Sequence, residues 1–158
     1  MHSASEAAHA APAEEQASSE RALWNPIAVA CWSVVFTPAF GAYLLMRNWE
    51  RLGEARQAAQ ARVWFCFSLG LLGVQMLSAA INSRLNSESN LMPWVSLAYL
   101  AAWSIAAALP QARLLRQRYG AAGYARRPWD MALLYAVLAG LACLLLQAGL
   151  SFLLVAAT

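Results

Sequence analysis

The sequence contains no lysine, and charged residues make up only 12% of its 158 residues, about half of the share in ordinary soluble domains. Its two histidines, His2 and His9, lie near the start of the chain. Its three cysteines, Cys31, Cys66 and Cys143, are far apart and form no CxxC pair. Zinc and redox sites need several such ligands at short spacing. We therefore expect no metal site, no redox cysteine pair and no cofactor.

Catalytic signatures are also missing. The sequence contains no HExxH or GxSxG motif, and no carboxylate pair or histidine within an apolar segment. A serine or cysteine nucleophile needs a base beside it. Neither Ser33, Ser68, Ser104 nor Cys66 has one nearby in the sequence. We therefore expect a protein that is not an enzyme and that has no catalytic or cofactor-binding residues.

Apolar side chains, by contrast, are abundant and make up 61% of the chain. A chain of this length has too much surface for its volume to bury that excess in its own core, so the bilayer is the simpler solvent. All acidic and arginine side chains fall outside four uncharged stretches, residues 26–46, 63–81, 93–109 and 131–157. Because about 20 residues of helix cross a bilayer, the sequence predicts an all-α membrane protein, a bundle of four transmembrane helices.

Residues 1–22 consist mainly of Ala, Ser, Glu and His, and no Leu, Ile, Val or aromatic residue precedes Leu23. Such a segment cannot bury enough apolar surface to offset the entropy lost on ordering. We therefore expect a disordered, acidic tail at 1–22, followed by a transmembrane domain at 23–158. The tail lacks the basic start of a signal peptide.

The segments between the predicted spans differ in charge. Residues 47–62 contain four arginines and residues 110–130 contain five, whereas residues 82–92 contain one. Arginine-rich loops stay in the cytoplasm. We therefore expect a multi-pass protein of the bacterial inner membrane with both termini in the periplasm. Arginines placed beside apolar spans also argue against a nucleic-acid partner and indicate contact with membrane lipids.

The two arginine-rich segments resemble each other. One contains Arg51-Leu52-Gly53 and the other Arg118-Tyr119-Gly120, and each is followed by further arginine and a tryptophan. Two tandem helical hairpins would produce such a repeat, and chance reuse of loop residues is the alternative.

Small residues recur every four positions in the third span, at Ala98, Ala102 and Ala106, and again at Ala136 and Gly140 in the fourth. That spacing forms a smooth stripe on one helix face, against which another helix can pack closely. We expect helix packing within the bundle, with the seam of a homo-oligomer as the alternative.

Polar and helix-breaking residues are few within the spans. Pro38 predicts a kink in the first span, either a fixed bend or a hinge. Gln75 and Gln147 are the most polar groups, and each should find a partner in the other or in Ser78 and Ser151. No Asp, Glu, Arg or His lies within a span, which argues against an ion-coupled transporter.

The runs Leu23-Trp24-Asn25-Pro26, Phe36-Thr37-Pro38-Ala39-Phe40-Gly41-Ala42-Tyr43-Leu44 and Asn48-Trp49-x-x-Leu52-Gly53 resemble those of small, uncharacterised proteobacterial inner-membrane proteins with four helices. The resemblance covers about residues 23–65 and implies no catalytic residue. Membrane proteins of this build include immunity partners of secreted antibacterial toxins.

These observations favour a non-enzymatic binding protein of the inner membrane. The resemblance makes this most concrete as an immunity protein that neutralises a membrane-acting antibacterial toxin. One alternative is a small channel or uncoupled transporter, with Pro38 as its hinge and Gln75 and Gln147 along its path. Another is an assembly or stress partner of a larger membrane complex.

Overall fold

The computed structural model describes residues 22–85, 91–120 and 123–156. Regular structure in these ranges is helical, apart from one isolated bridge between Leu23 and Arg126. The elements are α2 (Pro26–Val35), α3 (Pro38–Arg51), α4 (Ala55–Leu85), α5 (Leu91–Trp103), the π-helical turn η1 (Ser104–Ala108), α6 (Leu109–Tyr119) and α7 (Asp130–Ala156). The predicted tail lies outside the described residues except for Ala22.

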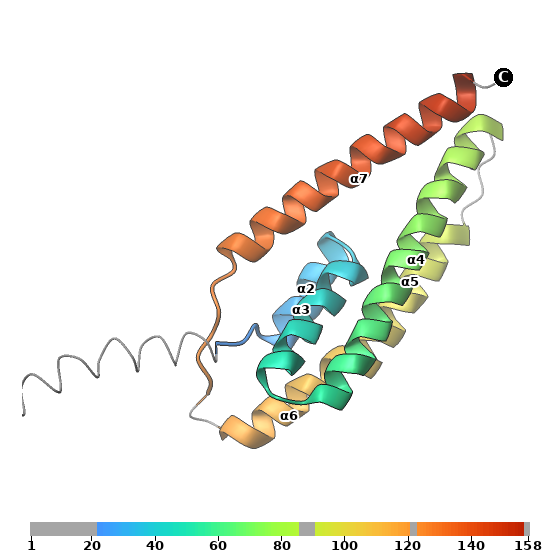
Figure 1. Ribbon diagram of the computed structural model, residues 1–158. Coiled ribbons are helices and arrows are strands. Elements are labelled where there is room, and N and C mark those ends of the chain that lie inside the picture. The colour runs from blue at the N-terminus through green and yellow to red at the C-terminus, as the bar shows by residue number, and fades with distance from the viewer. Residues whose placement is uncertain (1–21, 86–90, 121–122, 157–158) are drawn as a thin grey trace, which may run out of the picture.

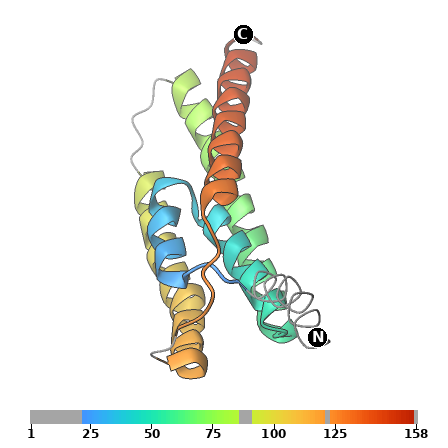
Figure 2. The ribbon, with the colours of Figure 1, turned by 90° about the vertical axis from the view of Figure 1, so that its left-hand side faces the viewer.

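The first predicted span, residues 26–46, is not one helix. It is broken into α2 and α3, which run in opposite directions as a hairpin (Figures 1 and 2). The outer ends of the hairpin meet, because the backbone N–H of Trp24 donates to Asn48 Oδ1 at 3.1 Å. Helices of 10 and 14 residues are about 15 and 21 Å long. Neither can cross a hydrocarbon layer of about 30 Å by itself, so the structure does not confirm this predicted span.

The break follows from the sequence Thr37-Pro38. A residue before proline favours an extended backbone, and Thr37 has φ −173° and ψ 158°. Its hydroxyl accepts a hydrogen bond from Phe40 N at 3.3 Å and so caps α3. Pro38 occupies the first turn of α3, where its missing N–H leaves no bond unmade. The expected kink is therefore wrong: Pro38 begins a helix and does not bend one.

Three helical stretches are long and apolar enough to cross a membrane: α4, the continuous run Leu91–Tyr119 and α7. They contain the second and third predicted spans and the fourth as far as Ala156, since residue 157 lies outside the described residues. The described residues are thus helical, with three stretches that could each cross a membrane and one short hairpin, and the four predicted crossings are not confirmed.

The third stretch passes through Pro110, where the sequence predicted an end at residue 109. Proline cannot donate the usual helical bond to the carbonyl four residues earlier. Here the helix widens into η1, and Leu109 N–H bonds to Ser104 O, five residues back. Such a π turn lets a helix continue past a local fault. It brings residues 111–119 into α6, a region that the sequence indicated to be a loop.

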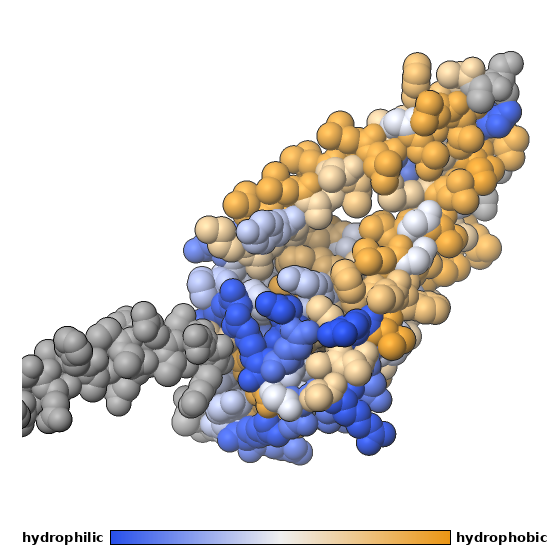
Figure 3. Space-filling view, in the orientation of Figure 1, coloured by the Kyte–Doolittle hydropathy of each residue, from blue (hydrophilic) through white to orange (hydrophobic). Residues whose placement is uncertain are grey.

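The helices α4 and α7 form two arms that approach each other at one end of the molecule, and the α2–α3 hairpin lies between them (Figures 1 and 2). The other end carries the described residues of the arginine-rich segments, 47–62, 110–120 and 123–130, and is hydrophilic (Figures 1 and 3). We call it the basic end. Arg51 Nη1 donates to Ala22 O at 2.7 Å there, whereas α7 ends at the opposite end. Ala22 and the end of α7 thus lie at opposite ends of the described structure, and the prediction that both termini are periplasmic stays a prediction.

The two similar arginine-rich segments have a local explanation. Gly53 follows the end of α3 and Gly120 follows α6, with φ of 73° and 53°. A glycine with positive φ commonly ends a helix. The repeated residues are therefore those that end a helix in each segment. The residues that follow differ, because α4 begins directly after the first helix end, whereas residues 123–129 lead to α7 after the second.

The core lies where α3 crosses α2 and η1. A Cβ atom on Gly41 would lie 1.9 Å from Ser33 Oγ and 2.5 Å from Trp103 Cη2. Trp103, Leu44 and Val29 are fully buried around this crossing. Gly41 is therefore the residue that allows the hairpin to close against the third stretch.

Candidate functional site

A groove of about 870 Å³ lies between α3, α4 and α7. We call it the α7 groove. Aromatic and aliphatic side chains of α3 and α4 form one wall, including Phe40, Tyr43, Phe65 and Leu72. Side chains of α7 form the other wall, where alanines and a glycine alternate with larger residues such as Tyr135 and Leu144. In Figure 3 the hollow is bordered by apolar surface above and by hydrophilic surface at the basic end. A groove of this kind suits a hydrophobic ligand.

Small residues give the groove its width. Ala132, Ala136, Ala139 and Gly140 line it from α7. A Cβ atom on Gly140 would meet nothing within 4 Å. Ala136 is buried, so α7 touches the rest of the molecule there, while the space beside Gly140 is open. The two residues predicted as a packing pair thus lie on one groove wall.

Charged groups stand at the basic end of the groove. Arg47, Arg127 and Asp130 line it there, together with Trp24. The guanidinium carbon of Arg127 lies 4.4 Å from the ring centroid of Trp24, and that of Arg51 lies 5.6 Å away. A cation over an indole face is held in place by the ring quadrupole. The apolar groove therefore ends in an oriented cluster with more basic than acidic side chains.

Carboxylates neutralise only part of this cluster. Glu50 forms ion pairs with both Arg47, at 2.8 Å, and Arg62, at 3.5 Å. Glu54 pairs with Arg118. Burial raises the pKa of the Tyr124 phenol above 10.0, although the charge of Arg126 opposes the shift. This tyrosine therefore stays neutral at physiological pH and adds no negative charge to the basic end.

A buried polar network fixes the part of the α7 groove that lies at the basic end, which we call the mouth of the groove. Asn48 Nδ2 donates to Trp24 O at 2.8 Å and to Gln111 Oε1 at 3.0 Å. Gln111 Nε2 donates in turn to Leu45 O at 3.1 Å. Asn48 and Gln111 are both fully buried. Buried amides with satisfied partners hold their neighbours in one arrangement, so this network sets the position of Trp24.

A two-stranded contact completes that position. Leu23 N donates to Ala125 O and Arg127 N donates to Leu23 O, each at 3.0 Å. The indole N–H of Trp24 donates to Pro128 O at 3.3 Å. The segment before α2 is thereby fastened to the segment before α7. Arg127 owes its place beside the groove to residues about a hundred positions earlier in the chain.

Sequence reasoning missed Asn48 and Gln111. Asn48 and Trp24 both lie in the runs that carry the family resemblance, which was an available signal. Gln111 lies in a segment that the sequence indicated to be a loop, and nothing in the sequence placed it beside Asn48.

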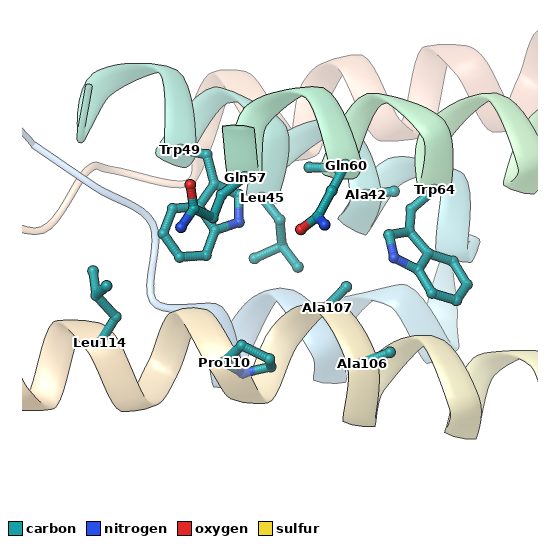
Figure 4. Close-up of a pocket in the computed structure, with 11 residues that line it drawn as sticks. Ala42, Leu45, Trp49, Gln57, Gln60, Trp64, Ala106, Ala107, Pro110 and Leu114 are labelled. Atoms are coloured by element: carbon teal, nitrogen blue, oxygen red, sulfur yellow. The ribbon is translucent and has the colours of Figure 1, made fainter. Parts of the chain in front are cut away.

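A second, smaller cavity of about 260 Å³ lies on the other side of α3, between α4 and the η1–α6 helix. Figure 4 shows Leu45 and Gln60 pointing from above toward Ala107 and Pro110, with Trp49 and Trp64 at the two ends. It has room and amide groups for a few water molecules. It contains no charged side chain and is less than a third the volume of the α7 groove. The groove is therefore the stronger candidate site.

The predicted stripe in the third span does not pack inside the molecule. Ala98, Ala102 and Ala106 are all exposed, and of the three only Ala106 lines a cavity, the smaller one. Helix α5 turns a different face inward, with Trp103 buried. The expectation of intramolecular packing at this stripe is therefore wrong, and a homo-oligomer seam stays a prediction.

The two membrane glutamines do not meet. Gln75 Nε2 donates to Ser96 Oγ at 2.6 Å and so links α4 to α5. Gln147 Nε2 donates to Ser151 Oγ at 3.4 Å, as the spacing predicted. Gln147 lines the α7 groove at the end away from the arginines, and its Oε1 is buried without a hydrogen-bond partner. Gln75 does not line the groove, so the two do not form one polar path.

Among the described residues, no group of three or more His, Cys, Asp or Glu side chains is placed to hold a metal ion. Cys31 and Cys66 are exposed, and Cys143 lines the groove. Comparison with known proteins gives no family, no curated protein and no solved structure that matches this chain. The resemblance of residues 23–65 therefore stays a hypothesis, and the α7 groove is the feature of the molecule that bears on its function.

Proposed function

We propose that this chain is a non-enzymatic integral membrane protein that binds the hydrocarbon part of an amphiphilic ligand in the α7 groove. The observation that carries the proposal is the groove itself: its walls are apolar, and charged side chains gather at one end only. From Met131 to Leu144, α7 offers about 20 Å of groove wall. One leaflet of a bilayer is about 15 Å deep, so a full lipid tail fits along this wall.

The proposed orientation follows the arginines. We propose that the basic end faces the cytoplasm of a bacterial inner membrane, because nine arginines lie in segments 47–62 and 110–130. The segment before α2 then lies on the cytoplasmic side and the end of α7 on the periplasmic side. The α2–α3 hairpin enters the membrane from the cytoplasm and returns to it. Protein on both sides of the hairpin is what allows a break such as Phe36-Thr37 at membrane depth.

The experiment fills the groove. Gly140→Phe places a ring where a Cβ atom meets nothing within 4 Å, so it should block the groove without forcing the helices apart. Gly149→Phe is the matched control, because Gly149 has equally open surroundings and does not line the groove. After mild detergent extraction, native mass spectrometry should find one retained lipid on the wild-type protein and on the Gly149→Phe variant. The Gly140→Phe variant should retain none.

Equal retention by all three proteins would contradict the proposal. So would a wild-type protein without any retained lipid.

A second candidate is an immunity protein that binds a transmembrane helix of a toxin in the same groove. The exposed small residues Ala139 and Gly140 on the groove wall favour it, because small side chains permit close helix contact. Here the Gly140→Phe variant should lose protection against one toxin, and the toxin, not a lipid, should be recovered with the wild-type protein. The channel hypothesis has no comparable support, since Gln75 and Gln147 have separate partners.

A further inference from the structure

The charged side chains at the mouth of the α7 groove indicate which class of ligand binds there. Three charged side chains line it, and two of them are basic: Arg47 and Arg127, with Asp130 as the acid. Arg47 shares its carboxylate partner, Glu50, with Arg62. One carboxylate cannot neutralise two guanidinium groups. The mouth therefore has an excess of positive charge directly beside an apolar wall.

One of the two arginines at the mouth, Arg127, is held in place by its neighbours. Arg127 is half-buried and stacks over Trp24 at 4.4 Å. Its backbone N–H is fixed by Leu23 O, and Trp24 is fixed by Asn48. An arginine with little freedom to move loses less entropy when it binds an oxyanion, and its planar fork matches two phosphate oxygens. Asp130, three residues later, starts α7 and flanks the same mouth.

Building on the proposed function, we propose that the amphiphile is an anionic phospholipid whose phosphate is bound by Arg127 and Arg47 while one tail lies along α7. Charge complementarity at the mouth carries this choice. A free phosphate would leave the apolar wall unused, and a zwitterionic lipid would bring an ammonium group into the basic cluster. The site belongs to one molecule of the protein, and it differs from general lipid contact because the tail is enclosed by α3, α4 and α7.

The test compares two lipids with identical tails, phosphatidylglycerol and phosphatidylcholine, titrated onto the detergent-solubilised protein. Native mass spectrometry measures the ratio of their apparent affinities. The wild-type protein should prefer phosphatidylglycerol. Replacing one well-placed arginine should reduce this preference about fivefold. Arg127→Gln and Arg47→Gln are the two test variants, so that the result does not depend on either one folding well.

Two further variants serve as controls. Arg116→Gln removes the same charge at the same end of the molecule, from an exposed residue that does not line the groove, and should leave the preference unchanged. Asp130→Asn removes the acid from the mouth while it keeps a residue that can begin a helix. It should raise the preference for phosphatidylglycerol, which a general loss of stability would not do.

The outcomes separate the two proposals. Retention of both lipids with equal affinity by the wild-type protein would overturn the anionic headgroup site and leave the groove as a binding site for tails. An equal loss of preference in Arg116→Gln and Arg127→Gln would also overturn it, since the effect would then be one of overall charge. Failure to retain either lipid would overturn both proposals. Recovery of a protein helix in place of lipid would favour the immunity function.

Discussion

Trp24 and Asn48 are joined by two hydrogen bonds that run in opposite directions. Trp24 N donates to Asn48 Oδ1 at 3.1 Å, and Asn48 Nδ2 donates to Trp24 O at 2.8 Å. The side-chain amide of Asn48 thus pairs both the backbone N–H and the backbone C=O of Trp24, as a neighbouring β-strand would. This pair closes the α2–α3 hairpin and holds the indole beneath Arg127.

Asn48→Leu should therefore destabilise the protein strongly. The substitution leaves the N–H and C=O of Trp24 and the Oε1 of Gln111 without these partners in a buried region. Unpaired buried groups cost about 1–3 kcal/mol each, and partial relaxation should bring the total loss of unfolding free energy to about 3 kcal/mol. Thermal unfolding in detergent measures it. Asn82 is half-exposed on α4, so Asn82→Leu should change the free energy of unfolding little. Equal losses in both variants would mean that the buried network contributes no special stability.

Gly41→Ala should cost about 1–3 kcal/mol of stability, the usual range for overpacking. The new methyl group would lie 1.9 Å from Ser33 Oγ and 2.5 Å from Trp103 Cη2, and the buried indole has little room to move. Gly73→Ala is the matched control, because no atom lies within 4 Å of its Cβ position in α4. It should be neutral or slightly stabilising, since alanine favours helix over glycine. The same melting temperature for both variants would contradict the close crossing of α3.

Leucine substitutions on the third stretch should separate its two faces. Ala108 is buried beside the hairpin, so Ala108→Leu should overpack the core and lower the melting temperature in detergent. Ala102 is exposed, and Ala102→Leu should change the unfolding free energy by no more than about 0.5 kcal/mol. A large effect at Ala102 alone would instead indicate that the stripe packs against a second copy. Chemical crosslinking of the purified protein would then detect that copy.

The two glutamines should respond differently to replacement by leucine. Gln75→Leu removes the 2.6 Å bond to Ser96, and interhelical bonds of this type contribute about 0.6 kcal/mol on average. Gln147→Leu removes a buried oxygen that has no partner and one long bond of 3.4 Å. An apolar side chain in its place should leave stability unchanged or raise it. Melting temperatures in detergent measure both effects. A lower melting temperature for Gln147→Leu than for Gln75→Leu would contradict the prediction.

The topology is tested by cysteine labelling in cells, in a variant without the three native cysteines. With the hairpin and a cytoplasmic basic end, Ala156→Cys should react with a membrane-impermeant reagent from outside, whereas Asn25→Cys and Arg116→Cys should not. Four crossings would instead place residue 25 outside. Labelling of position 25 on intact cells would therefore indicate that residues 26–46 cross the membrane. Labelling of position 116 would indicate that the basic end faces the periplasm.

By itself, the sequence indicated a membrane protein and located its three long helices, although it did not determine where α4 begins or where the third stretch ends. An apolar share of 61%, with every charge outside four stretches, permits little except helices in a bilayer. The same count could not distinguish a helix that crosses from two that turn back, because both bury the same residues in the same hydrocarbon. The Thr37-Pro38 pair indicates the start of a new helix, since a capping residue before proline commonly begins one. A proline is also found at kinks inside a single helix, so the sequence alone left both possibilities open.

Tertiary structure alone decided the site. Trp24 and Arg127 are about a hundred positions apart, and Asn48 and Gln111 more than sixty. No periodicity within a helix can report such pairs, because side-chain spacing reaches only the neighbouring turns. Their contact depends on the hairpin turning back at Thr37 and on η1 carrying the helix past Pro110. The arms α4 and α7 then stand apart along the groove, and the space between them is a property of how the helices pack, which no single segment of the chain encodes.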